Sequence, residues 1–134
     1  MPLRPLARGA LVTVSRSTTL AEVARLLGAR GVDVAVVTDR NRAVGLVTTH
    51  DIVVRGVARR FPADARIDTV MTDEVVTLPA TADRREAADA LQAPGVPHLV
   101  LVDGHEPVAV LTRDDLVVEL AATLAEVTGT PDPS

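Results

Sequence analysis

The sequence repeats itself with a period of 64 residues. When residues 11–55 are placed over residues 75–119 without a gap, about a third of the positions are identical, and most others exchange one aliphatic residue for another. A period of this kind indicates a supersecondary unit that cannot bury its apolar face alone. Two copies predict one compact, pseudo-symmetric domain. Each copy would bring the same polar pair to a cleft between them, Thr48 with Asp51 and Thr112 with Asp115.

Both copies predict the same order of elements, which is strand, helix, strand, strand, helix. Apolar residues at helical spacing mark the helices, and runs of β-branched residues mark the strands. The strands are expected at 11–14, 32–38, 43–47, 75–78, 98–103 and 107–111, and the helices at 19–30, 52–60, 83–93 and 112–126. We therefore expect an α+β protein of two β-α-β-β-α motifs packed into one module. Its expected parts are a lead-in (1–10), motif 1 (11–60), a linker (61–74), motif 2 (75–126) and a flexible tail (127–134).

Composition narrows the class of protein. Hydrophobic residues make up 47% of the 134 residues, yet Phe61 is the one aromatic, so the core must be aliphatic. The surplus of aliphatic surface favours a homodimer. A net charge of −4 and the lack of aromatics argue against nucleic-acid binding. The absence of cysteine suits a cytoplasmic location, and no apolar run is long enough to span a membrane.

The pair Thr-x-x-Asp occurs at the start of the last predicted helix of each copy, as Thr48–Asp51 and Thr112–Asp115. A carboxylate there can accept both hydrogen bonds of a ribose diol, as the acidic residue does in dinucleotide-binding folds. The threonine hydroxyl and free N–H groups at a helix start suit a phosphate. The same pattern is also a capping box, in which the two side chains only terminate the helix. The two interpretations are compatible with each other.

Several longer segments resemble the cystathionine-β-synthase (CBS) domain, present here as a tandem pair. The resemblance rests on residues 44–52 (VGLVTTHDI), 70–78 (VMTDEVVTL), 95–100 (GVPHLV) and 109–116 (AVLTRDDL). It implies a disc-like, stand-alone regulatory module with two clefts. Such a module would bind an adenosine derivative (AMP, ADP, ATP or S-adenosylmethionine), signal to a partner protein and dimerise, without a required cofactor.

The resemblance also places candidate ligand-binding residues. Those near the adenine would be Val32, Asp33, Val96, Pro97 and His98, with Thr72 and its counterpart Arg8 on the approach. In the Asp51 cleft, His50 and Arg55 could contact a phosphate. In the Asp115 cleft, Asp114 and Asp115 would repel a phosphate, and Arg113 offsets only one of these two carboxylates. We therefore expect the Asp51 cleft to be the better anion site.

Four positions depart from the family pattern and keep a second hypothesis open. Val36 and Val100 stand where the family often has proline, Ala109 replaces the glycine found at Gly45, and Arg84 takes the place of core Leu20. Each change could narrow a cleft, which would leave a structural or protein-interaction module without a ligand. An enzyme is not expected, because the serines lack a His/Asp relay and the three histidines lack metal-ligand spacing.

Overall fold

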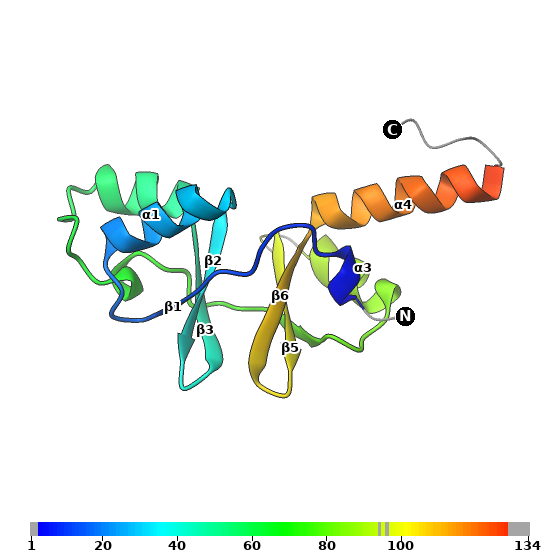
Figure 1. The fold of residues 1–134 in the computed structure, drawn as a ribbon, viewed down its shortest axis with the longest axis horizontal. Helices are drawn as coiled ribbons and strands as arrows, with labels where there is room; N and C mark the ends of the chain where they lie inside the picture. Colours follow the sequence, from blue (N-terminus) through cyan, green and yellow to red (C-terminus); the bar gives the residue numbers. More distant parts are fainter. Residues whose placement is uncertain (1–2, 94, 96, 129–134) are drawn as a thin grey trace.

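The computed structural model describes residues 3–93, 95 and 97–128, and it shows two three-stranded sheets flanked by helices (Figure 1). Motif 1 contains β1 (Thr13–Ser15), α1 (Leu20–Arg30), β2 (Val34–Asp39), β3 (Arg42–Thr48), α2 (Thr49–Asp51) and η2 (Ile52–Val57). Motif 2 contains β4 (Thr77–Pro79), α3 (Arg84–Gln92), β5 (His98–Asp103), β6 (Glu106–Thr112) and α4 (Arg113–Thr128). The 3-10 turns η1 (Arg4–Leu6) and η3 (Ile67–Thr69) precede the two motifs. The predicted α+β architecture is confirmed.

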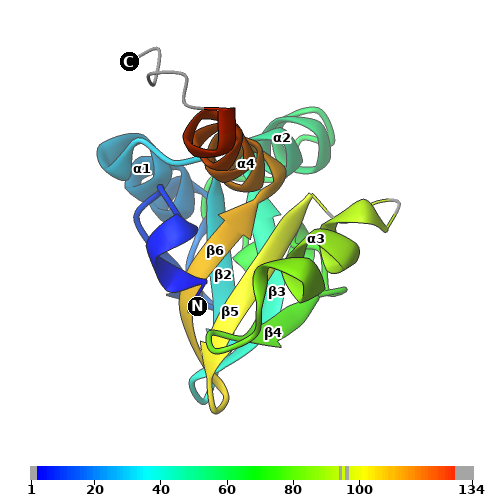
Figure 2. The same cartoon turned by 90° about the vertical axis from the view of Figure 1, so that its right-hand side faces the viewer.

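Both sheets have the same topology and register. The first strand pairs parallel to the second, which pairs antiparallel to the third through a tight hairpin. Thr13 lies opposite Val36 in one sheet, and Thr77 lies opposite Val100 in the other. The residues of the second pair lie 64 positions after those of the first, so the two sheets have equivalent strand register. Figures 1 and 2 show the two sheets side by side with the helices toward one end of the module.

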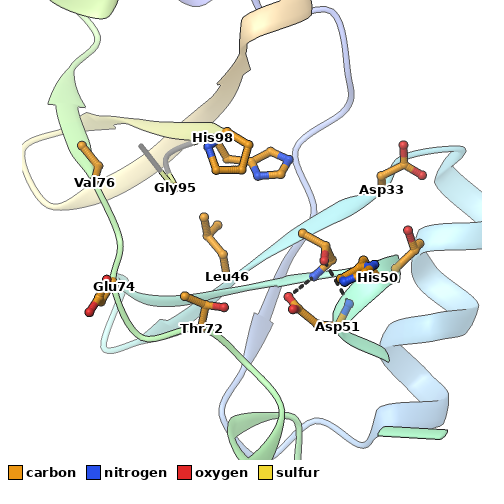
Figure 3. Close-up of a pocket in the computed structure, with 12 residues that line it drawn as sticks. Asp33, Leu46, His50, Asp51, Thr72, Glu74, Val76, Gly95 and His98 are labelled. Atoms are coloured by element: carbon orange, nitrogen blue, oxygen red, sulfur yellow. Dashed lines mark hydrogen bonds between the residues drawn. The ribbon is translucent and has the colours of Figure 1, made fainter. Parts of the chain in front are cut away.

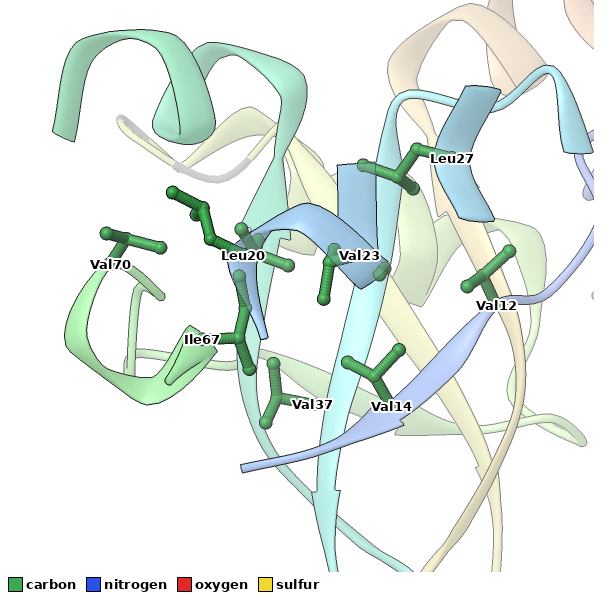
Figure 4. Close-up of a cluster of buried hydrophobic side chains, with 10 residues drawn as sticks. Val12, Val14, Leu20, Val23, Leu27, Val37, Ile67 and Val70 are labelled. Carbon is green, nitrogen blue, oxygen red and sulfur yellow. The ribbon is translucent and has the colours of Figure 1, made fainter. Parts of the chain in front are cut away.

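Each motif has an aliphatic core between its helix and its sheet. In motif 1 the apolar stripe of α1, formed by Leu20, Val23 and Leu27, packs over β1 and β2 (Figure 4). Thr19 caps this helix, and Gly31 ends it in the left-handed conformation (φ 64°), which glycine adopts without steric cost. A third cluster of Val36, Leu46 and Val100 joins the two sheets. The departures at Val36 and Val100 therefore fill the core between the motifs.

The segment before each motif packs on the other motif. Leu3 and Leu6 are buried in the core of motif 2, and Ile67 and Val70 are buried in the core of motif 1. Figure 1 shows the N-terminal segment, in dark blue, beside α3 and β6 before the chain crosses to β1. The repeat therefore extends to residues 3–8 and 67–72, and neither motif is complete without chain from outside it.

The helix predicted at 52–60 is present but ends earlier, at Val57, and it is not α-helical. Residues Ile52–Val57 form the π-helix η2, in which Ala58 donates its N–H to Val53 at 2.9 Å. Gly56 is buried against Leu20 in this helix. A Cβ at position 56 would lie only 3.0 Å from Leu20 Cδ2. In motif 2 the equivalent of Gly56 is Leu120, and α4 is a continuous α-helix. Arg84, at the place of Leu20, forms an ion pair with Glu119 at 2.7 Å.

Most other predicted boundaries differ from the observed ones by one or two residues, as is usual where helix and strand ends fray. Helix α4 runs to Thr128, past the predicted start of the tail, and residues 129–134 lie outside the described part of the chain. The predicted helix end at Pro94 also lies outside it, and α3 ends at Gln92.

Candidate functional site

Two cavities lie between the motifs, and their linings are related by the repeat. The Asp51 cavity has a volume of about 710 Å³ and the Asp115 cavity about 560 Å³. Every residue that lines the first cavity except Val76 has its counterpart, 64 positions away, in the lining of the second. The first lining consists of Asp33, Leu46, Thr48, Thr49, His50, Asp51, Thr72, Glu74, Val76, Gly95, Pro97 and His98. The repeat predicts a cleft between the motifs, and the structure contains two, as the family resemblance implies.

Asp51 forms the capping box that its spacing from Thr48 predicts. The Thr48 N–H donates to Asp51 Oδ2 at 2.9 Å, and the Asp51 N–H donates to Thr48 Oγ1 at 3.1 Å (Figure 3). The Asp51 carboxylate is half-buried at the cavity wall. Within the described residues, no hydrogen bond reaches its second oxygen, Oδ1. Capping therefore occupies one carboxylate oxygen and leaves the other to face the cavity.

Asp115 forms the same box but is more enclosed. Thr112 N–H donates to Asp115 Oδ2 at 2.9 Å, and the Asp115 N–H donates to Thr112 Oγ1 at 3.2 Å. In addition, the backbone N–H of Arg8 donates to Asp115 Oδ1 over a long 3.4 Å. Asp115 is only 7% exposed. Both of its carboxylate oxygens are thus engaged within the chain.

The linker segment forms one rim of the Asp51 cavity. Thr72 and Leu46 exchange two backbone hydrogen bonds of 2.8 Å, so residue 72 lies against β3 like an extra strand residue. This places Glu74 and Val76 at the cavity edge (Figure 3). The segment can approach β3 closely because position 45 is glycine, where a Cβ would lie 3.1 Å from the Thr72 carbonyl oxygen and would overlap Met71.

His98 belongs to the walls of both cavities and faces Leu46 across the first one (Figure 3). Burial lowers the pKa of His98, and the carboxylates of Asp51 and Asp33 partly oppose this shift. The imidazole is therefore neutral at pH 7.

The lowered pKa of His98 predicts a loss of stability in mild acid. The unfolded chain takes up this proton near its ordinary pKa of about 6.5, before the folded protein does, so stability falls as pH drops below that value. Urea unfolding at about pH 7.5 and 5.5 should show a smaller loss for His98→Gln than for the wild type. His105→Gln, at an exposed hairpin tip, is the matched control and should retain the full loss. Equal losses in all three proteins would contradict the prediction.

Most of the predicted ligand residues line a cavity. Thr48, His50, Asp51 and Thr72 line the Asp51 cavity, and Val32, Thr112, Arg113 and Asp115 line the other; Asp33, Pro97 and His98 line both. Arg55 lines neither, because its guanidinium donates to the Met71 carbonyl at 3.4 Å. The Arg113 guanidinium reaches the cavity rim but donates to the carbonyls of Leu91 and Ala93, at the end of α3. Val96 lies outside the described residues.

Sequence reasoning missed part of the lining. Leu46, Thr49, Glu74, Val76 and Gly95 line the Asp51 cavity but were not singled out. Glu74 could have been found, because it follows Thr72 by two residues in the predicted approach segment. The linker crosses onto β3 because of tertiary packing, and no local sequence pattern predicts this crossing.

In the part of the chain that the structure describes, no cluster of three or more His, Asp or Glu side chains could hold a metal ion. None of the helices described is long and apolar enough to cross a bilayer.

Known proteins resemble this chain in sequence and structure. A CBS domain protein from Pyrobaculum aerophilum, solved in complex with AMP, is 27% identical, with a TM-score of 0.76 over 91% of this chain and 99% of that one. The CBS domain pair of protein MJ0100, solved with 5′-methylthioadenosine and S-adenosyl-L-methionine, is 18% identical, with a TM-score of 0.78 over 92% and 98%. The likeness to MJ0100 establishes the fold.

Sequence relatives include an uncharacterized protein of Methanocaldococcus jannaschii, 27% identical over 122 residues, and one of Methanopyrus kandleri, 26% identical over 126 residues. This chain spans 66% and 64% of their respective lengths, which is less than two thirds. The CBS domain family matches the chain twice, at residues 4–57 and 67–122. The two matches cover both motifs together with the segments that precede them, so the chain belongs to the CBS domain family and carries the domain as a tandem pair.

Proposed function

We propose that this protein is a regulatory module that binds an adenosine derivative in the Asp51 cavity and signals its occupancy to a partner protein in the cytoplasm. The observation that carries the proposal is the free Oδ1 of Asp51 at the wall of a cavity of about 710 Å³. A carboxylate in this position suits a ribose diol, and the cavity volume is in the range of small-molecule sites. The AMP bound by the Pyrobaculum relative supports the ligand class.

The cavity offers a different partner for each part of such a ligand. Leu46, Val76 and Pro97 form an apolar wall suited to the flat face of an adenine. The free oxygen of Asp51 suits the ribose, and His50 and Thr49 lie one and two residues before it, at the start of α2, within reach of a 5′ substituent. Because the wall residues come from both motifs, a bound ligand would bridge them. Signalling requires that the ligand bind one arrangement of the motifs more tightly than another.

The charges of the lining rank the candidate ligands. Three carboxylates, Asp33, Asp51 and Glu74, line the Asp51 cavity, and the described lining contains no arginine or lysine. The predicted anion site thus lacks Arg55, the cation expected to support it. A triphosphate brings more negative charge to this acidic lining than a diphosphate or a monophosphate does, whereas a sulfonium brings a positive charge. We therefore expect S-adenosylmethionine and AMP to bind more tightly than ADP, and ATP to bind most weakly.

Calorimetric titration of ligand-stripped protein with AMP, ADP, ATP and S-adenosylmethionine tests the proposal. Saturable binding of at least one compound is the expected result. No heat with any of the four, at two temperatures, would refute it and would favour the ligand-free interaction module. Three departures that motivated that alternative, Val36, Val100 and Ala109, lie outside both cavity linings, so they do not narrow either cavity.

We also propose that the module is a homodimer. Exposed apolar side chains follow α2–η2 and α4, and we call them the apolar strip; they are Val53, Val54, Val57, Val117, Val118, Leu120 and Leu124. Val53 and Val54 repeat as Val117 and Val118, and Figure 2 shows α2 and α4 at the same end of the module. A second copy presents the same strip, and a two-fold interface pairs a surface with itself.

Val117→Asp should convert the dimer to a monomer, because it places a charge at the centre of the apolar strip. Light scattering over a range of protein concentrations measures the mass. The matched control is Ala21→Asp, an exposed residue in the first turn of α1 where an acidic side chain is tolerated. A wild type that is monomeric throughout, or a Val117→Asp variant that remains dimeric, would refute this interface.

A further inference from the structure

We infer that the N-terminal lead-in closes the Asp115 cavity to a nucleoside, so that the chain binds one ligand and not two. The inference rests on the proposed function, because it concerns which of the two cavities takes the ligand. It starts from a hydrogen bond that has no counterpart in the other cavity, from the Arg8 N–H to Asp115 Oδ1 at 3.4 Å. The repeat equivalent of Arg8 is Thr72, whose N–H donates to the Leu46 carbonyl and not to Asp51.

The lead-in is anchored, so this contact is held in place. Leu3 is fully buried and donates its N–H to the Ala80 carbonyl at 3.1 Å. Leu6 is buried in the core of motif 2, and η1 packs against β6 and α4. The chain therefore reaches Arg8 from a fixed direction and covers the carboxylate at the start of α4. Asp115 is 7% exposed, whereas Asp51 is half-buried.

The two equivalent segments follow different paths beside β3 and β6. On β3, Gly45 leaves room for the linker to lie against the strand and pair with Leu46. On β6 the equivalent residue is Ala109, which packs in the core of motif 2 together with Ala7, the counterpart of Met71. Among the described residues, no bridge joins Arg8 to Val110, the counterpart of Leu46. The N–H of Arg8 is thus free to meet Asp115.

The hydrogen bonds to Asp115 leave no free carboxylate oxygen for a ribose. In the Asp115 cavity both carboxylate oxygens already accept a backbone N–H, so a diol would have to displace the lead-in. Three carboxylates line each cavity, so their number does not distinguish the two. The Arg113 guanidinium is bound to the end of α3. In the Asp51 cavity, by contrast, Oδ1 of Asp51 accepts no hydrogen bond from the described residues. The lead-in therefore acts as a specificity determinant that makes two similar clefts unequal.

Arg8→Pro tests this inference, because proline removes the N–H donor without requiring a new path for the preceding residue. Ala7 has φ −73° and ψ 116°, a conformation that proline tolerates in the residue before it. Arg8→Ala is the matched control, since it deletes the side chain and keeps the N–H. In titrations with AMP, we expect one site per chain for the wild type and Arg8→Ala, and two for Arg8→Pro. Adding Asp115→Asn to Arg8→Pro should return the count to one.

Two sites in the wild type, or one site in a folded Arg8→Pro variant, would overturn the inference and leave the proposed function standing. No AMP binding by any of these proteins would instead refute AMP binding as the proposed function, and the inference with it. Amide hydrogen exchange gives a second measurement that does not depend on Arg8→Pro folding. The Arg8 amide should be protected in the wild type and should exchange at least about tenfold faster in Asp115→Ala. A factor of about ten corresponds to the net contribution of a hydrogen bond to a charged group. Unchanged protection would overturn the inference.

Discussion

Asp51→Ala should weaken the binding of AMP about 10- to 150-fold, the effect of losing about 1.5–3 kcal/mol of hydrogen bonding to a charged group. The free Oδ1 is the group expected to accept from the ribose, and alanine offers no acceptor. The affinity measured by calorimetry at one pH and ionic strength checks the prediction. The loss should be largest for S-adenosylmethionine and smallest for ATP, because Asp51→Ala also removes one of the three carboxylates of the lining.

The same change also removes a helix cap, so stability must be measured beside affinity. Loss of the cap should lower the free energy of unfolding by about 0.5–2 kcal/mol. Asp115→Ala is the control, because it removes the matching cap from α4 and its carboxylate lies in the other cavity. We expect it to lose similar stability and to keep AMP affinity in the Asp51 cavity. Unchanged affinity in Asp51→Ala would show that the ribose contact is wrong.

Gly45→Val should lower the free energy of unfolding by about 1–3 kcal/mol, as overpacking does at a tight site. A Cβ at this position overlaps Met71 and approaches the Thr72 carbonyl to 3.1 Å, so the linker must move away from β3. Both hydrogen bonds between Leu46 and Thr72 depend on that approach. Chemical denaturation of the variant measures the loss.

Gly28→Ala is the matched control for Gly45→Val. Gly28 lies in α1, and a Cβ there would meet no atom within 4 Å. Alanine also restricts the unfolded chain, so this variant should gain about 0.4–1 kcal/mol. If Gly45→Val were as stable as the wild type, the close packing of the linker on β3 would be wrong.

The sequence alone determined the architecture, because a repeat and an apolar period are properties of the chain itself. The spacing of Leu20, Val23 and Leu27 sets the buried face of α1, and Thr48 and Asp51 form the capping box that their spacing predicts. Register followed too, since the two copies align without a gap and pair their strands identically. The positions of most cavity residues came from the family resemblance, and the structure places them around the two cavities.

Only the tertiary structure decided how the two cavities differ. Arg55 stands four residues after Asp51, yet the π-helical turn and the Met71 carbonyl hold its guanidinium away from the cavity. Arg8 lies 107 positions from Asp115, and packing of the lead-in on motif 2 brings its N–H to that carboxylate. Local patterns fix which groups each element presents. The contacts between segments far apart in the chain depend on how closely backbones approach, and here Gly45 allows the linker to lie against β3.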